Sequence, residues 1–238
     1  MVFPIPVGDN IKEKGWPWTL FILIISCFGI FIYGRYINPD AVGNIVKYGA
    51  LRPKIFLEVW GDVISDPLML IKAPLDFVIL GVVPVFSHMF LHAHELHLLG
   101  NMIFLFVFGK TMERRLGHLR FLFFYILCGI IAMIVHLIMD PMKELPMVGA
   151  SGAIAGVLGG YLISFPRARI KLVLWAIILF TAEVPAFFFL LLWFLFQVIN
   201  AQNTLLCLGG CEGIAYFAHV GGFIAGTILV FPFRKSLK

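Results

Sequence analysis

The chain has 238 residues, of which 61% are hydrophobic and only 13% charged, and its mean hydropathy is +0.99. Soluble domains carry about 25% charged residues, so this composition excludes an ordinary soluble enzyme and indicates a chain that crosses a membrane several times. The net charge of +5 does not indicate a nucleic-acid partner, because the basic residues lie in short segments between apolar runs. Lipid offers no hydrogen-bond partners and no strand alternation is apparent, so we expect an all-α membrane protein.

Six apolar runs predict six transmembrane helices, at roughly 17–34, 95–112, 119–139, 150–165, 184–200 and 215–233. The first run follows Lys12 and Lys14 and could imitate a signal peptide. It continues past Cys27 without a clear break, and a polytopic chain follows, so we interpret it as the first span. Residues 170–182 are apolar but too short to cross a bilayer, and we expect an interfacial or partly inserted segment there.

The first loop, about residues 35–94, is long and mixed in charge. It contains Trp60 and many apolar side chains, so we expect a lateral structure that lies partly in the outer leaflet. The four cysteines are scattered. Cys27 and Cys128 lie within apolar runs and are interpreted as packing residues, whereas Cys207 and Cys211 share a polar loop, where a disulfide is possible but not required.

Basic residues set the predicted orientation. They precede the first run, separate the second from the third, and follow the fourth and the sixth, whereas the loops 140–149 and 201–214 contain only Lys143 between them. The positive-inside rule then places both termini in the cytoplasm. Spans two, four and six accordingly begin at the outer side of the membrane, which puts His97, Asn101, Ser151 and His219 at a similar depth.

These four polar residues are candidates for a catalytic site, because polar side chains inside a membrane are costly. Ser151 needs an adjacent base to act as a nucleophile, and the imidazole of His219 suits that role. Acyl transfer also needs donors for a developing oxyanion. His97 and Asn101 share one helix face, and the backbone N–H groups at the start of the fourth span add further donors.

Glycines predict close packing of the fourth and sixth spans. Gly152, Gly156 and Gly160 repeat every fourth residue in the fourth span, and Gly222 and Gly226 do so in the sixth. Small residues at this spacing let helix backbones approach. We therefore expect the two spans to bring Ser151 towards hydrogen-bonding distance of His219.

The motifs around these residues resemble those of the rhomboid intramembrane serine proteases. The matching stretches are Ser87 to His92, His97 to Met102, Gly149 to Gly156, and Ala218 to Gly222 with Gly226, together with Gly109, Glu113, Arg115 and Gly117. The resemblance covers roughly residues 85–230 in the same order and spacing. It implies a single domain over residues 1–238 with a six-helix bundle of rhomboid type.

The resemblance also implies the chemistry. Ser151 would be the nucleophile and His219 the general base and then acid, without an aspartate. His97, Asn101 and the Ser151 backbone would form the oxyanion hole, and His92 would be a nearby structural or hydrogen-bonding residue. Gly149, Gly152 and Gly222 would support the site. The implied partners are transmembrane protein substrates in the lipid bilayer, and neither a metal nor an organic cofactor is implied.

Two departures from the family pattern are visible. Residues 82–85 replace a Trp-Arg pair that some members carry in the first loop. Ala155 stands where some members place an aromatic ring against the catalytic histidine. The orientation of His219 must then come from other neighbours. Glu113 and Arg115 are expected to be structural, because they lie about a bilayer's thickness from Ser151.

Two alternatives compete with the protease interpretation. A non-catalytic, rhomboid-like membrane-client binder would lack the dyad, and both residues of the dyad are present. A metal-dependent membrane protein could use the cluster His88, His92, His94 and His97. However, His94-Glu95-Leu96-His97 is one residue short of the zinc motif His-Glu-x-x-His, and His92 and His97 are five residues apart.

The access route and the location are also predicted. We expect a polar pocket that opens to the exterior, a mobile cap at residues 202–213, and lateral access for the substrate past the fifth span, which is rich in Phe187, Phe188, Phe189, Trp193 and Phe196. Short termini without a transit peptide favour a prokaryotic plasma membrane. The substrate and the oligomeric state cannot be derived from the sequence.

Overall fold

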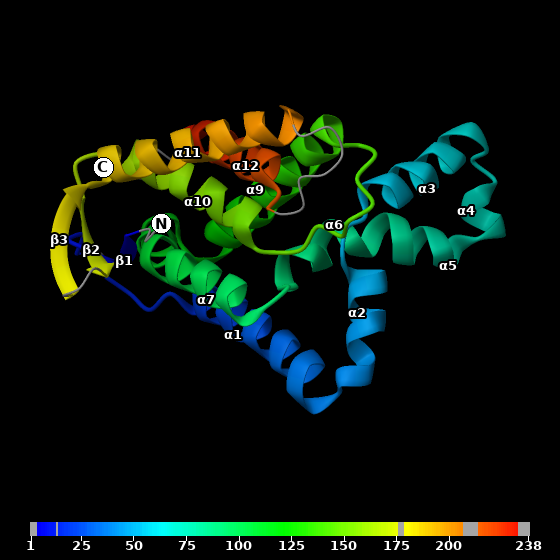
Figure 1. Cartoon of the computed structure of the whole chain (residues 1–238), viewed down its shortest axis with the longest axis horizontal. Helices are drawn as coiled ribbons and strands as arrows, with labels where there is room; N and C mark the ends of the chain where they lie inside the picture. Colours follow the sequence, from blue (N-terminus) through cyan, green and yellow to red (C-terminus); the bar gives the residue numbers. More distant parts are fainter. Residues whose placement is uncertain (1–3, 13, 176–178, 207–213, 233–238) are drawn as a thin grey trace.

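The computed structural model describes residues 4–12, 14–175, 179–206 and 214–232. Within them the chain is a helical bundle with a small sheet at one end and a helical projection at the other (Figure 1). The six apolar runs coincide with helices α1 (Trp18–Ile32), α7 (Glu95–Phe104), α9 (His118–Met139), α10 (Ser151–Ser164), α11 (Ala186–Leu206) and α12 (Tyr216–Leu229). Helix α1 continues through η1 (Tyr33–Ile37), and α7 continues through η5 (Leu105–Gly109) into α8 (Lys110–Leu116).

Length divides these helices into two groups. Three segments are long and apolar enough to cross a membrane alone, namely Trp18–Ile37, His118–Met139 and Ala186–Thr204. The helical stretch Glu95–Leu116 supplies a fourth if it is joined, across a bend of 76°, with Pro74–Phe90. Helices α10 and α12 have only 14 residues each. At 1.5 Å per residue they are about 21 Å long, which is less than the roughly 30 Å of a hydrocarbon core.

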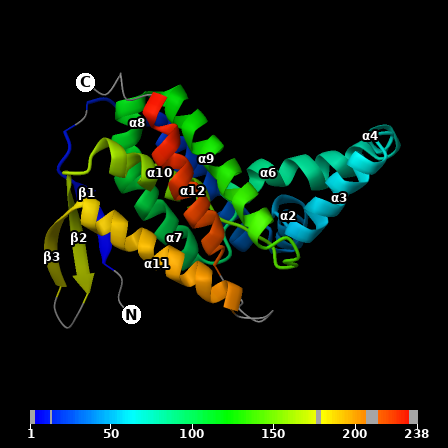
Figure 2. The same cartoon turned by 90° about the horizontal axis from the view of Figure 1, so that it is seen from above.

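Of the two short helices, α10 lies in the middle of the bundle, whereas α12 exposes Ile224 and Ile228. Helix α10 is buried over ten consecutive residues, from Gly152 to Tyr161, so it has no solvent- or lipid-facing side there. Helices α9 and α12 pack against it, and α11 runs alongside α12 (Figure 2). Helix α10 is short and apolar on all sides. Longer neighbouring helices therefore shield it from water and lipid.

The prediction that all structure is helical is wrong at one end of the molecule. Strands β1 (Ile5–Asp9), β2 (Arg169–Trp175) and β3 (Leu179–Pro185) form an antiparallel sheet in the order β1-β2-β3. The described part of the apolar segment 170–182 thus lies in the paired strands β2 and β3, and its interfacial or partly inserted position stays a prediction. Exposed Arg169 and Lys171 alternate with buried Ile170 and Leu172, which is the period-two pattern of a half-buried strand.

Polar contacts attach this sheet to the bundle. The carboxylate of Asp9 accepts hydrogen bonds from Thr111 Oγ1 at 2.7 Å and from Tyr161 Oη at 2.9 Å.

The carboxylate of Glu113 accepts hydrogen bonds from the backbone N–H groups of Thr19 and Leu20 in the first turn of α1, at 2.8 and 2.6 Å. Glu113 therefore caps a helix, since the first N–H groups of a helix have no partner within it.

The long first loop is a helical projection on the side opposite the sheet (Figures 1 and 2). Its elements are η2 (Pro39–Ala41), α2 (Val42–Gly49), α3 (Pro53–Ser65), α4 (Met69–Lys72), α5 (Pro74–Asp76), η3 (Phe77–Val82), α6 (Val83–Ser87) and η4 (His88–Phe90). Trp60 holds α3 against η3, because its indole N–H donates to the Gly81 carbonyl at 3.0 Å and its ring packs edge-on against Phe77. Several large apolar side chains of this region are exposed, including Ile64, Ile71 and Leu75.

Candidate active site

Ser151 and His219 meet at the ends of two neighbouring helices. Ser151 is the first residue of α10, and His219 lies in the first turn of α12. Ser151 Oγ lies 2.8 Å from His219 Nε2, which is hydrogen-bonding distance. The two residues are 68 positions apart in the sequence, so the packing of α10 against α12 creates this contact.

Glycine allows α10 and α12 to approach closely. A Cβ atom built on Gly222 would lie 2.1 Å from the carbonyl oxygen of Gly152, and one built on Gly226 would lie 1.8 Å from that of Gly156. A Cβ on Gly159 would lie 2.1 Å from the Phe223 carbonyl. The predicted role of Gly160 on this interface is wrong, since a Cβ there would meet Phe124 and Met112 instead. The helical spacing 152, 156 and 159 explains the difference.

The turn before Ser151 brings the predicted oxyanion donors together. Gly149 has φ +126°, which a residue with a side chain rarely adopts. A Cβ at Gly149 would lie 2.9 Å from the His97 ring and 3.6 Å from Asn101 Nδ2. The Gly149 N–H donates to the His88 carbonyl at 2.9 Å, which fixes the turn. His97 and Asn101 therefore both reach the backbone that leads into Ser151.

Asn101 has an unused donor. Its side chain is buried, and its Nδ2 has no hydrogen-bond partner within the part of the chain that the structure describes. Buried amide groups normally have partners, and those without one are explained by water, a ligand or a catalytic role. An amide N–H beside the nucleophile is the type of group that an oxyanion would use.

A third side chain contacts the dyad, and it was missed in the sequence. Gln197 of α11 is buried, and its Oε1 lies 2.8 Å from His219 Nδ1. The rings of Trp193 and Tyr216 also pack beside the imidazole, with centroids 6.0 and 6.1 Å away. These residues are the other neighbours that orient His219 in the absence of an aromatic ring at Ala155. A glutamine directly after the apolar stretch 186–196 was the available signal, because buried polar groups in membranes need a partner.

A cavity of about 430 Å³ opens beside Ser151. It is lined by both Ser151 and His97, and by the chain segments 93–97, 146–148 and 214–215 that surround them. Asn101 and His219 are not part of its lining but lie directly behind it. Ser151 is therefore accessible from the cavity, whereas His219 is buried.

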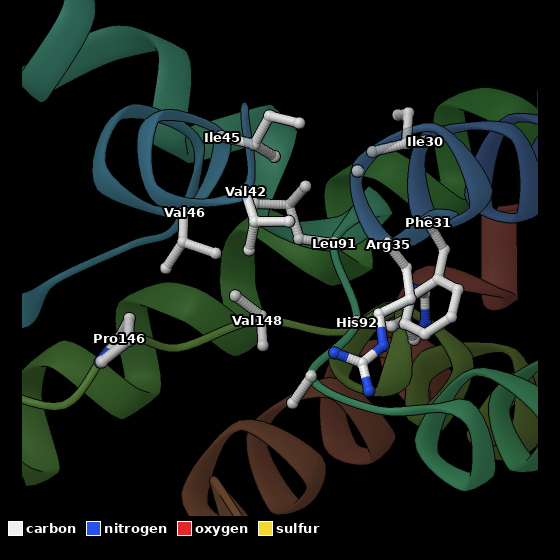
Figure 3. Close-up of a pocket in the computed structure, with 12 residues that line it drawn as sticks. Ile30, Phe31, Arg35, Val42, Ile45, Val46, Leu91, His92, Pro146 and Val148 are labelled. Carbon is white, nitrogen blue, oxygen red and sulfur yellow. The ribbon is translucent and has the colours of Figure 1, made fainter. Parts of the chain in front are cut away.

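A second cavity of about 350 Å³ lies next to the first and shares Ala93, Pro146 and Val148 with it. Figure 3 shows it between the end of α1, helix α2 and the segments 91–93 and 146–148. Most of its lining is apolar, and Arg35 is its one charged side chain. Arg35 Nε lies 3.4 Å from Glu95 Oε1, so the charge is paired.

The remaining histidines are not arranged around a common position for a metal ion among the described residues. The rings of His92 and His94 pack against His97, with centroids 5.2 and 5.8 Å away. His92 lies before the first residue of α7. Its spacing of five residues from His97 therefore does not place the two side chains on different faces of one helix. His118 contacts Glu113 at the far end of the bundle. Across the described residues, no group of three or more His, Cys, Asp or Glu side chains is arranged to hold a metal ion.

Two of the sequence-based expectations lie outside the described residues. These are the disulfide between Cys207 and Cys211, and most of the mobile cap at residues 202–213. Cys27 and Cys128 are free and buried, in agreement with packing roles.

The rhomboid-domain family model matches residues 81–236 of the chain. The chain belongs to the rhomboid family. The match covers α10, α12 and α7, and therefore all four residues of the predicted site. It begins near the end of the helical projection, so most of the first loop lies outside it.

Relatives from several kingdoms carry the same family name. RHOMBOID-like protein 4 of Arabidopsis thaliana is 28% identical over 94% of this chain and 55% of its own length. Rhomboid protein 1, mitochondrial, of Saccharomyces cerevisiae is 29% identical over 66% of this chain and 43% of its own. The putative rhomboid protease YdcA of Bacillus subtilis is 46% identical over 30% of this chain and 36% of its own. The chain thus spans only about a third to just over half of these relatives.

Proposed function

We propose that this rhomboid family member is an intramembrane serine endopeptidase, which hydrolyses peptide bonds in or near transmembrane segments of other membrane proteins. The observation that carries the proposal is the hydrogen bond between Ser151 Oγ and His219 Nε2, at 2.8 Å and inside the bundle. Serine is a weak nucleophile unless a base lies within reach of its hydroxyl. A serine kept only for helix packing has no need of a buried imidazole in this position.

The dyad acts in two half-reactions. His219 Nε2 takes the proton of Ser151 as Oγ attacks the scissile carbonyl, and the imidazolium then gives this proton to the leaving amine. The acyl group stays on Ser151 Oγ. A water molecule, deprotonated by the same imidazole, attacks the ester, and the proton returns to Oγ as the acid leaves. No metal or organic cofactor takes part.

The oxyanion that forms in each half-reaction is stabilised by three donors. They are the Ser151 backbone N–H, the Asn101 amide and the His97 ring, which the Gly149 turn brings together. The unpaired Nδ2 of Asn101 supports this assignment. Loss of one such donor in serine proteases costs about 100- to 1,000-fold in kcat. His92 supports the arrangement by packing against His97.

Substrate and water use the two adjoining cavities. The cavity beside Ser151 holds the scissile bond and the attacking water. The apolar cavity that shares its wall accepts an apolar side chain of the bound substrate. The transmembrane substrate arrives laterally past α11, whose Phe187, Phe188 and Leu192 are exposed. A crosslink that pins α11 to α7 should abolish cleavage, and unaffected turnover would refute lateral access.

The chain crosses the membrane six times, with both termini in the cytoplasm and the dyad towards the exterior. The basic loops support this orientation. The short helices α10 and α12 still cross, because the helices around α10 separate it from lipid and the exposed Ile224 and Ile228 of α12 face the lipid directly. The exposed apolar side chains of the projection lie in the outer leaflet. Residues 1–238 act as a single domain, and a prokaryotic plasma membrane remains our prediction for its location.

Cleavage of a reporter transmembrane segment by the purified protein in lipid tests the function. Wild type should cleave, and Ser151→Ala and His219→Ala should each lose activity by about 10⁴-fold or more while remaining folded. A wild-type protein that binds the reporter without cutting it would favour the non-catalytic membrane-client binder. Sensitivity to chelators combined with indifference to serine-directed phosphonates would favour a metal-dependent protein.

A further inference from the structure

Gln197 is the polar group that completes the surroundings of His219. It lies on α11, which contributes no other side chain to the hydrogen bonds of the dyad among the described residues. Its amide has two ends with different chemistry, because Oε1 only accepts and Nε2 only donates hydrogen bonds. Oε1 lies 2.8 Å from His219 Nδ1, and Nε2 lies 3.4 Å from the backbone carbonyl of Trp193.

The Trp193 carbonyl determines which end of the amide faces the histidine. A carbonyl oxygen can only accept a hydrogen bond, so the end of Gln197 that faces it has to be the NH₂ group. The oxygen of the amide must then face His219. The opposite orientation would place two carbonyl oxygens against each other and leave the NH₂ group to donate to Nδ1.

This orientation of the Gln197 amide selects one tautomer of the neutral imidazole. An oxygen acceptor beside Nδ1 requires Nδ1 to carry the hydrogen, and in the neutral ring Nε2 then holds the lone pair. Nε2 is the atom that lies 2.8 Å from Ser151 Oγ. With the other tautomer, Nε2 would donate towards the serine and could not take its proton.

We infer that Gln197 is a positioning residue, which holds His219 in the tautomer and ring orientation that a general base needs. It has the place that a carboxylate has in a catalytic triad, but it is neutral. A buried carboxylate within a membrane would carry a large desolvation cost, whereas an amide can be buried at little cost when both ends are bonded. The inference rests on the proposed function of Ser151 and His219.

Three variants of α11 separate positioning from packing. Gln197→Leu keeps nearly the same volume but removes the acceptor, and Gln197→Glu keeps an acceptor oxygen at the same reach. Asn200→Leu is the matched control. The Asn200 amide also donates to a carbonyl four residues earlier, that of Phe196 at 2.7 Å, but it is about one helical turn away from Gln197 and makes no hydrogen bond to Ser151 or His219 among the described residues.

The direct measurement is the tautomer of His219 by ¹⁵N NMR of histidine-labelled protein in lipid nanodiscs, at a pH where the imidazole is neutral. The signals are assigned from a His219→Ala sample. Wild type, Asn200→Leu and Gln197→Glu should show hydrogen on Nδ1, and Gln197→Leu should show a mixture of both tautomers. Hydrogen on Nε2 in wild type, or no change in Gln197→Leu, would overturn the inference.

Cleavage kinetics give the second readout. Gln197→Leu should lower kcat by about 10- to 100-fold with little change in KM, which corresponds to losing one buried hydrogen bond. Gln197→Glu should recover most of this loss, and Asn200→Leu should match wild type. Equal loss in Gln197→Leu and Gln197→Glu would mean that an acceptor oxygen beside Nδ1 is not what the reaction requires, and would contradict the inference. If wild type did not cleave at all, the proposed function would fail, but the NMR result would still decide whether Gln197 sets the tautomer.

Discussion

Helix α12 carries His219 and helix α11 contacts it through Gln197, but the two helices are held in the bundle by different contacts. Helix α12 meets α10 backbone to backbone, and Cβ atoms built on Gly222 and Gly226 would collide with carbonyl oxygens of α10 at 2.1 and 1.8 Å. Helix α11 meets α12 through rings. Phe194 stacks on Phe223 with centroids 4.5 Å apart, and Trp193 lies 6.1 Å from the same ring.

The difference separates a fixed part of the site from an adjustable one. The distance between Ser151 and His219 depends on two backbones that leave no room for a side chain. The hydrogen bond that Gln197 Oε1 accepts from His219 depends on a helix held by side chains, which can repack at modest cost. A substrate that displaces α11 would therefore disturb the orientation of His219 before it disturbed the dyad distance.

The largest effect is expected for Gly222→Ala. Its Cβ would need the Gly152 carbonyl to move, so α10 and α12 must separate. We expect destabilisation by about 2 kcal/mol or more from overpacking, together with loss of cleavage. Thermal unfolding in detergent and the reporter assay measure the two effects. Gly29→Ala in α1 is the control, because its Cβ would meet nothing within 4 Å and should stabilise the helix by about 0.5–1 kcal/mol. Wild-type behaviour of Gly222→Ala would refute the packing account.

Gly149→Ala should affect the reaction more than the fold. Gly117→Ala is a matched control, because both glycines have positive φ, at +126° and +83°, but only Gly149 has the His97 ring within reach of a new Cβ. Both variants should lose about 1–3 kcal/mol of stability from backbone strain. Only Gly149→Ala should lower kcat, by about 100-fold, as expected for a displacement of about 1 Å in the oxyanion donors. Equal kcat values for the two variants would remove His97 from the proposed oxyanion hole.

Phe194→Leu tests the adjustable contact. The smaller side chain leaves α11 packed against Phe223 less well, so we expect a loss of about 1 kcal/mol in stability. Cleavage should remain within a few-fold of wild type, because the dyad contact does not depend on this ring. A loss of activity as large as that of Gly222→Ala would mean that the site depends on the packing of α11 as strictly as on the packing of α12.

The smallest effect is expected at the ion pair that joins the projection to the segment before Ser151. Lys54 Nζ lies 2.9 Å from Glu144 Oε1, next to the backbone bridge between Leu51 and Met147. The hydrogen bond raises the pKa of Lys54 and lowers that of Glu144. The contribution of Glu144 is therefore lost as pH falls through its folded-state pKa, and that of Lys54 is lost as pH rises through its own.

Removing this pair by Glu144→Gln should lower the midpoint of thermal unfolding at pH 7 only slightly, since exposed ion pairs contribute little. This small difference should vanish once the pH is below the lowered folded-state pKa of Glu144, where the carboxylate is protonated in both the folded and the unfolded state. Unfolding midpoints of wild type and variant across this range provide the measurement. A clear loss of stability at pH 7 would show that side chains, and not the backbone bridge, hold the projection in place.

Much of the site could be predicted from the sequence because polar residues in an apolar chain are few and their depth follows from span direction. That reasoning predicted that Ser151 and His219 would meet. It could not find Gln197, whose role depends on the rotation of α11 and on the Trp193 carbonyl. The choice between Gly159 and Gly160 likewise depends on helix rotation. The β2 strand was missed although Arg169 to Leu172 alternate, because the apolar composition suggested membrane insertion.

The most direct test of the central claim is covalent labelling of Ser151 by a fluorophosphonate, located by mass spectrometry of the protein in lipid. We expect an adduct on Ser151 Oγ in wild type, and labelling slowed by about 100-fold or more in His219→Ala, because the hydroxyl then lacks its base. An unlabelled Ser151 in a folded protein, or labelling at the same rate without His219, would contradict the proposal that the two residues form a catalytic dyad.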